Sequence, residues 1–177
     1  IDEEYVWLAK QEIKVVPEGD MARVELFEVY ENMTYDRQEI FYSFSLPESS
    51  AVTGLWLSNS PDKAESFKFT VSTRGAAQEV YNREVRRQVD PALMEQVGPR
   101  QYRLRAFPVP PKIYDRDEDS QEEQPRLYLW MAFNVMHRED GWPMPRVAEK
   151  RNVFRNHKTE YFQNGARVKS PGKSWIP

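Results

Sequence analysis

Three aspartates alternate with other residues near the middle of the chain, at Asp115, Asp117 and Asp119. Carboxylates at the first, third and fifth positions are typical of the EF-hand calcium loop. That loop also needs a glycine at its sixth position and a bidentate glutamate at its twelfth, where this chain has Ser120 and Arg126. The EF-hand interpretation fails on both counts, so a solvated acidic loop over 115–123 is favoured over a weaker calcium site.

Other residue types that carry catalysis are sparse or badly spaced. His137 and His157 belong to no HExxH or i, i+4 pair, so each is expected to be a surface or satisfied histidine. The chain has no cysteine, which excludes disulfides, thiol nucleophiles and cysteine-bound zinc. We therefore predict no catalytic, cofactor-binding or metal-binding residues. A hydrolase using acids of the 115–123 loop is the least favoured alternative.

Arginines crowd one region, with Tyr81 and Tyr102 between them: Arg83, Arg86, Arg87, Arg100, Arg103 and Arg105. Arginine interleaved with tyrosine is typical of nucleic-acid-binding faces. However, acidic residues lie among them, and the formal net charge of the chain is −3. An ion-paired surface or a contact for another protein domain is therefore favoured, and no nucleic-acid partner is expected.

Five tryptophans and nine tyrosines offer flat faces on which sugars stack, which makes a glycan-binding β-sandwich the alternative function. Trp7, Trp56 and Trp130 fall in predicted strands and are expected in the core or at an interface. Trp142 and Trp175 lie near prolines and are expected to be exposed.

The hydrophobic pattern is mostly period two, which predicts half-buried strands. The clearest strands are 40–46, 67–71 and 102–106, and further candidates at 6–16, 24–29 and 51–57 bring the total to about seven or eight. The apolar phase changes between Leu26 and Phe27, which predicts a bulge there. Segment 127–135 is apolar on both faces, as expected of a central strand covered on both sides. Segment 108–111 is expected to be an extended loop.

One helix is predicted from an apolar stripe at helical spacing, Ala77, Val80, Tyr81 and Val85. A shorter helix is predicted over 91–97, with Asp90 as N-cap, Pro91 at the first position and Gly98-Pro99 as the stop. The predicted fold class is mainly β: an antiparallel β-sandwich with one amphipathic helix and a short helical turn inserted.

Length and composition favour one soluble domain over 1–177. No run approaches the ~20 apolar residues that span a bilayer, and the acidic start does not resemble a signal peptide. The absence of a starting Met suggests a fragment of a larger protein. Segment 146–177 carries eight Lys or Arg against two Glu, and this basic extension is expected to pair with the acidic body or approach a flanking domain.

The order of the features resembles the VIT domain, the β-rich module of inter-α-trypsin inhibitor heavy chains and their bacterial relatives. The similarity covers about 20–137 and rests on segment 22–32, Tyr42-Ser43-Phe44-Ser45-Leu46-Pro47, Ala51-Val52-Thr53-Gly54-Leu55, Ala77-Gln78-Glu79-Val80-Tyr81, Asp90-Pro91-Ala92-Leu93-Met94 and segments 102–111 and 127–135. Arg74-Gly75 and segment 86–97 depart from the family pattern. Trp142-Pro143-Met144-Pro145 and the basic extension are similar to a bacterial branch of integral membrane proteins linked to the PEP-CTERM sorting system.

The resemblance implies a β-sandwich without enzymatic chemistry of its own. The family module commonly precedes a von Willebrand A domain, whose Asp-x-Ser-x-Ser run is not present in this sequence. We expect a non-catalytic structural or protein-interaction module of a larger, membrane-tethered, extracytoplasmic protein. Its expected partners are other domains of the same chain or another protein, with membrane contact only through flanking segments and no cofactor.

Overall fold

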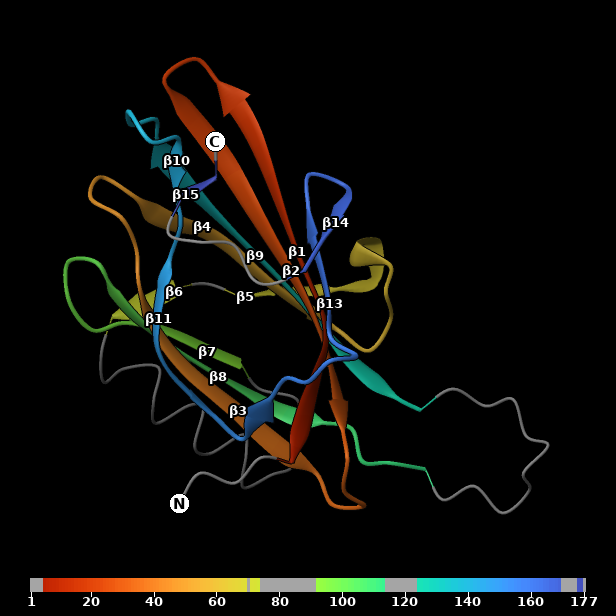
Figure 1. The fold of residues 1–177 in the computed structure, drawn as a ribbon. Helices are drawn as coiled ribbons and strands as arrows, with labels where there is room; N and C mark the ends of the chain where they lie inside the picture. The colour runs from red at the N-terminus through yellow and green to blue at the C-terminus, as the bar shows by residue number, and fades with distance from the viewer. Residues whose placement is uncertain (1–4, 70, 74–91, 114–123, 170–174, 177) are drawn as a thin grey trace.

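The computed structural model describes residues 5–69, 71–73, 92–113, 124–169 and 175–176. Within these residues, strands form two large sheets that pack face to face, together with one two-stranded pair (Figure 1). The predicted mainly β fold with two sheets is confirmed. The only helical element among the described residues is a 3₁₀ turn, η1 (Lys63–Glu65).

The larger sheet, called the A sheet, has eight strands. Their order is β14 (Ala166–Val168), β13 (Glu160–Gln163), β1 (Val6–Glu18), β2 (Met21–Asn32), β9 (Arg126–Met136), β4 (Ala51–Ser58) and β5 (Phe67–Phe69), with β12 (Val153–Phe154) also paired to β1. The five-stranded B sheet has the order β11 (Arg146–Arg151), β3 (Gln38–Ser45), β8 (Gln101–Val109), β7 (Ala92–Gln96) and β6 (Val71–Thr73). The short pair is β10 (Trp142–Pro143) with β15 (Trp175–Ile176).

Most strand pairs are antiparallel, but three are parallel: β1 with β12, β1 with β13, and β6 with β7. The antiparallel prediction therefore holds only in part. The two parallel pairs of β1 arise because β12 and β13 return to its free side after the chain has crossed from β11 in the B sheet.

The core lies between the A and B sheets and follows the period-two pattern. In β3 and β8 the buried side chains alternate with more exposed ones, as predicted for 40–46 and 102–106: Ile40, Tyr42, Phe44, Tyr102, Leu104 and Ala106. Each apolar side chain buried this way stabilises the fold by about 1.5–3 kcal/mol.

Strand β9 is central, as predicted for 127–135. It pairs with β2 on one side and with β4 on the other. Its odd-numbered residues, such as Leu129 and Phe133, join the core between the sheets, while Trp130 lies on the outer face of the A sheet. Apolar side chains on both faces are therefore needed along this strand.

The predicted bulge is in a different strand. Strand β2 pairs with β9 without any register shift, whereas β1 shifts between Leu8 and Lys10. The Thr159 hydroxyl donates to the Leu8 carbonyl at 2.7 Å, which satisfies the backbone group next to this irregularity. Phe27 and Val29 break the apolar phase of β2 because they are shielded from solvent on the outer face of the A sheet, where Phe27 is partly buried and Val29 is 3% exposed.

The prediction of a short helix over 91–97 is wrong. Ala92–Gln96 is strand β7, which pairs antiparallel with β8, and Met94 is fully buried. Gly98-Pro99 forms the turn of this hairpin, closed by the hydrogen bond from the Val97 amide to the Gln101 carbonyl at 2.8 Å. Pairing with a core strand overrode the local helix signals. The amphipathic helix predicted over 77–85 lies outside the described residues.

Three further boundaries also differ from expectation. The run 67–71 divides into β5 in the A sheet and β6 in the B sheet. Strand β8 extends through Pro108 to Val109, into the predicted loop. The basic extension is not an appended tail, since β11 is an edge of the B sheet and β12, β13 and β14 belong to the A sheet.

Asn152 joins the two sheets at the point where β11 ends and β12 begins. Its φ of 63° lies in the left-handed region that asparagine tolerates better than most residues. Its amide nitrogen donates to the Glu39 carbonyl in the B sheet at 2.7 Å, and its Oδ1 accepts from the Tyr5 amide beside the A sheet at 3.0 Å. One side chain thus links both layers.

Replacement of Phe133 by alanine should lower the free energy of unfolding by about 3–5 kcal/mol, because the ring is 1% exposed between the sheets. The matched control is Met136→Ala in the same strand, whose side chain is 41% exposed and should cost less than about 0.5 kcal/mol. Chemical denaturation of both variants measures the difference. Equal losses would contradict the assigned facing of β9.

Candidate functional site

The outer face of the A sheet carries an aromatic surface that we call the outer aromatic row. It consists of Phe162 on β13, Phe27 on β2, Tyr128 and Trp130 on β9, and Trp56 on β4. Trp130 is paired directly with Phe27 on one side and with Trp56 on the other. The Phe27 and Trp130 rings stack with centroids 5.0 Å apart, and Tyr128 stacks against Phe27 at 6.2 Å. Cross-strand aromatic pairs of this kind stabilise a sheet.

Lysines lie over this row at both ends. Lys10 Nζ is 4.8 Å from the ring centroid of Phe162 and 5.6 Å from that of Phe27. At the other end, Lys63 Nζ lies 4.0 Å from the Trp56 ring and Lys68 Nζ lies 5.3 Å from it. These cation–π contacts each add about 0.5–1 kcal/mol at exposed positions.

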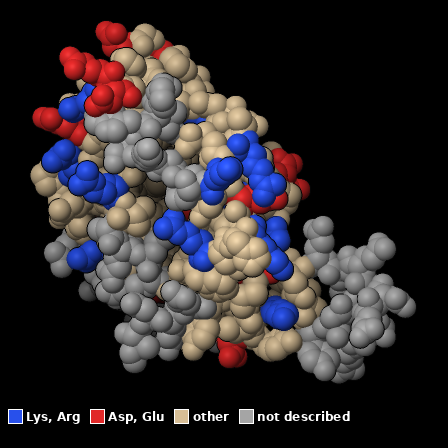
Figure 2. All heavy atoms as spheres, in the orientation of Figure 1, with Lys and Arg blue, Asp and Glu red and all other residues tan. Residues whose placement is uncertain are grey.

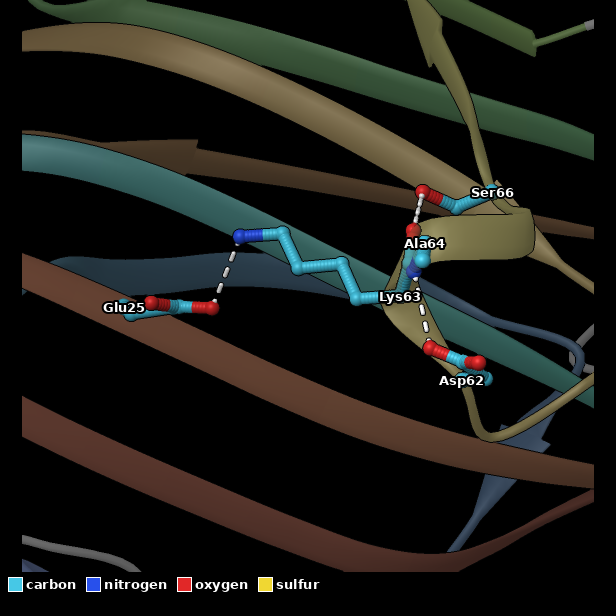
Figure 3. Close-up of polar contacts among 5 residues, drawn as sticks. All are labelled: Glu25, Asp62, Lys63, Ala64 and Ser66. Atoms are coloured by element: carbon cyan, nitrogen blue, oxygen red, sulfur yellow. Dashed lines mark hydrogen bonds and ion pairs between the residues drawn. The ribbon is translucent and has the colours of Figure 1, made fainter.

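The Lys63 side chain extends from η1 toward Glu25, as Figure 3 shows. Its Nζ is 2.9 Å from Glu25 Oε1 on β2, although η1 follows β4 in the chain. The turn is fixed at its start by Asp62, whose side chain accepts from the Ala64 amide at 3.0 Å. Ser66 donates to the Lys63 carbonyl at 2.6 Å. These contacts hold the lysine stem across the outer face of the A sheet.

The Trp56 ring lies against Gly54 on its own strand. A Cβ at position 54 would overlap the six-membered ring of Trp56, so a larger residue there would require this ring to shift. Since Lys63 lies over the same ring, both neighbours restrict access to this tryptophan.

A buried polar group lies on the opposite, inner side of β2. The Glu28 side chain is 1% exposed and accepts from Gln11 Nε2 at 3.3 Å. The fully buried Tyr30 and Tyr42 share this space. Burial is the largest cause that raises the pKa of each phenol well above 10.0, and the negative charge of Glu28 is the second. Since these three side chains are enclosed by the core, we assign them a structural role.

The histidines lie on the surface, as predicted. His137 and His157 are both exposed, and His137 packs edge-on against Trp142 with ring centroids 4.8 Å apart. Among the described residues, no three His, Cys, Asp or Glu side chains are grouped closely enough to hold a metal ion. The acidic loop at 115–119 lies outside the described residues.

Of the crowded arginines, Arg103 and Arg105 lie on the outer face of the B sheet, and Arg105 packs over Phe41 at 5.5 Å. Tyr102 is 3% exposed and stacks on Phe44, so it is not available to stack on a base. Arg83, Arg86, Arg87 and Tyr81 lie outside the described residues.

The tryptophans differ from expectation in one respect. Trp142, expected to be exposed, is 8% exposed and belongs to the core cluster. Trp7 is partly buried and donates from Nε1 to Asn156 Oδ1 at 3.1 Å. The Trp175 side chain lies outside the described positions. The sequence did contain the signal for the outer aromatic row, since Phe27 and Val29 break the inner phase of β2.

The single sequon, Asn32-Met33-Thr34, is unsuited to a glycan in the folded state. Asn32 is 1% exposed, and its amide nitrogen donates to the Asp36 carbonyl at 2.6 Å and to the Val109 carbonyl at 3.2 Å. Its Oδ1 accepts from the Thr34 amide at 2.8 Å. The side chain therefore organises the β2–β3 turn.

The family model of the vault protein inter-alpha-trypsin (VIT) domain matches residues 8–114. The chain belongs to this family. A comparison with curated proteins gave no match. Among solved structures, this VIT domain is similar to the collagen-binding subdomain of the Enterococcus faecalis surface protein ACE, at 10% identity and a TM-score of 0.35, over 71% of this chain and 70% of that one.

The matched segment of this VIT domain begins and ends earlier than the similarity expected over 20–137. It ends before β9, yet β9 lies between β2 and β4 in the A sheet. Strands that follow the matched segment thus complete both sheets.

The two buried phenols predict a pH dependence. Because the pKa values of Tyr30 and Tyr42 are raised in the folded state, both phenols stay protonated there at a pH at which the unfolded chain would lose the protons. Their contribution to stability is complete below pH 10.0 and is lost as the pH rises above it. In an alkaline titration followed by tyrosinate absorbance, at least two of the nine tyrosines should ionise only on unfolding. The Tyr30→Phe/Tyr42→Phe variant should lose this delayed step; a wild type without it would contradict the assignment.

Replacement of Gly54 by alanine should cost about 1–3 kcal/mol of stability, because the new methyl group overlaps the Trp56 ring. In a Trp56→Ala background the same replacement should cost nothing. A double-mutant cycle by chemical denaturation measures this coupling. If both backgrounds lose equal stability, the ring does not constrain position 54.

Proposed function

We propose that this VIT domain is a non-catalytic protein-interaction module of a larger, membrane-tethered, extracytoplasmic protein. The observation that carries this proposal is the outer aromatic row. Aromatic side chains are enriched at protein interfaces and supply much of their binding energy. In this domain five aromatic side chains lie side by side on the sheet face that points away from the core. All of them except Trp130 are partly exposed. The proposed partner is another domain, of the same chain or of a second protein.

The glycan-binding alternative is weaker. A sugar stacks on an open ring face, but Trp56 has Gly54 on one side and Lys63 near its ring. Trp130 and Trp142 are nearly buried, and the Trp7 indole nitrogen is already hydrogen-bonded. The described tryptophans are therefore poorly placed for stacking.

Membrane tethering and the bacterial branch linked to PEP-CTERM sorting rest on the similarity of Trp142-Pro143-Met144-Pro145 and the basic segment that follows. The described residues contain no helix with the length and apolar character needed to cross a bilayer. The proposed tether lies in flanking sequence. The complete reading frame tests this directly, and transmembrane segments beside residues 1–177 are the expected finding.

We also propose that 1–177 is one folding domain, because β9 and β11–β14 complete sheets begun by earlier strands.

Site-specific photo-crosslinking tests the interaction surface. The photoreactive residue benzoylphenylalanine placed at Tyr128 in the complete protein should give a discrete adduct with one partner domain after illumination, identified by mass spectrometry. Val147, which is 51% exposed at the edge of the other sheet, provides the matched control position. Adducts at Tyr128 that are absent or identical to those at Val147 would reject the outer aromatic row as the contact surface.

A further inference from the structure

A cleft of about 710 Å³ opens at one end of the sandwich, away from the outer aromatic row. Three segments meet there: the end of β3, the β7–β8 turn, and the segment from Arg138 to the start of β11. Figure 1 shows the β3–β4 connection and the β7–β8 turn side by side at the left of the view. The Leu46 amide donates to the Arg100 carbonyl at 2.8 Å, which joins the first two segments.

Three arginines line this cleft, Arg100, Arg138 and Arg146. All three residues are exposed. Ser45 pairs with Arg146 on one side and Gln101 on the other, so polar side chains lie in one row across β11, β3 and β8.

Among the described residues that line the cleft, Glu48 alone carries a carboxylate. Glu48 Oε2 is 3.5 Å from Arg138 Nη2, and the two side chains are 73% and 46% exposed. This is a loose surface pair of the kind that contributes little to stability. Among the side chains that the structure describes, no carboxylate pairs with Arg100 or Arg146. The cleft thus carries an excess of positive charge in a chain whose net charge is −3.

Apolar side chains form part of the cleft walls. Pro47, Pro99 and Pro143 contribute rigid rings, and the buried Leu46 and Met144 also line the cleft, with 3% and 8% exposure. Guanidinium groups pair in a bidentate manner with carboxylates, and the apolar walls suit the aliphatic parts of a peptide.

We propose that this arginine cleft binds a short acidic peptide segment of a partner protein. This is a second binding surface, and it does not depend on the partner proposed for the outer aromatic row. Glu48 occupies one of the carboxylate positions when the peptide is absent.

A nucleic acid is a poorer occupant of the same charges. None of the described side chains that line the cleft is aromatic, so bases would find no stacking surface. Exposed acids also lie near by in the fold, since Glu139 and Asp140 follow Arg138 and the Asp20 carbonyl accepts from the His137 amide. Figure 2 shows Asp and Glu side chains gathered at the upper left of the molecule and Lys and Arg side chains over its middle. A long polyanion would extend past the cleft onto these acidic side chains and be repelled by them. A short acidic peptide would stay within the cleft, beside the arginines.

Phage display of random dodecapeptides on the 177-residue chain, followed by fluorescence anisotropy with the selected peptides, tests the proposal. The selected peptides should be rich in Asp and Glu, and their Gln and Asn counterparts should not bind. Affinity should fall at least about tenfold in Arg100→Gln/Arg146→Gln. It should also weaken as salt rises from about 50 to about 300 mM. Arg167→Gln, an exposed arginine in the A sheet, is the matched control and should leave affinity unchanged.

Glu48→Gln provides an independent variant with the opposite expected sign. Removing the internal carboxylate should tighten peptide binding by up to about fivefold. The proposal is overturned if no acidic peptide is selected, or if the double variant binds as well as the wild type. Full displacement of the peptide by citrate, or by an oligothymidine at equal concentration, would equally reject it in favour of a small carboxylate or a nucleic acid. None of these outcomes alters the crosslinking at Tyr128.

Discussion

The insertion of β9 between β2 and β4 is the constraint on which both sides of the A sheet depend. Without it, the β1–β2 hairpin and the β4–β5 hairpin would have no common neighbour. The pairing register of β9 also determines which side chains face the core and which face the outer side of the A sheet. The same alternation that places Phe133 in the core places Trp130 between Phe27 and Trp56 on the outside. A register slip of one residue would exchange these faces and lose the core and the outer aromatic row together.

Much of this architecture was accessible from the sequence, because period-two patterns record burial directly. The strands around Tyr42 and Leu104, and the two-sided strand around Trp130, follow from the spacing of their apolar residues. The order of these segments also indicated the VIT family, which the match of the family model over residues 8–114 confirms. The candidate site was less accessible, because no local pattern states which strands lie next to one another. Only the register brings Phe162, Phe27, Trp130 and Trp56 into one row.

The wrong predictions share a physical cause, which is long-range pairing acting on locally ambiguous segments. Ala92–Gln96 has a plausible helix start and stop, yet it forms a strand because β8 provides a partner for its backbone. The irregularity in β1 is supported by Thr159, a residue 151 positions away from Leu8, so no local window could reveal it. Trp142 lies among prolines, which suggested exposure, but its ring packs into the core.

The parallel pairing of β1 with β12 and β13 imposes an order on events during synthesis. Strand β1 is made first among the described strands, and one of its edges is covered at once by the β2 hairpin. Its other edge waits for residues 153–163, which leave the ribosome much later. An uncovered strand edge can pair with foreign chains while the nascent protein grows. Lys10, Glu12 and Lys14 place charge along β1, and charged side chains on an open strand edge disfavour pairing with other chains.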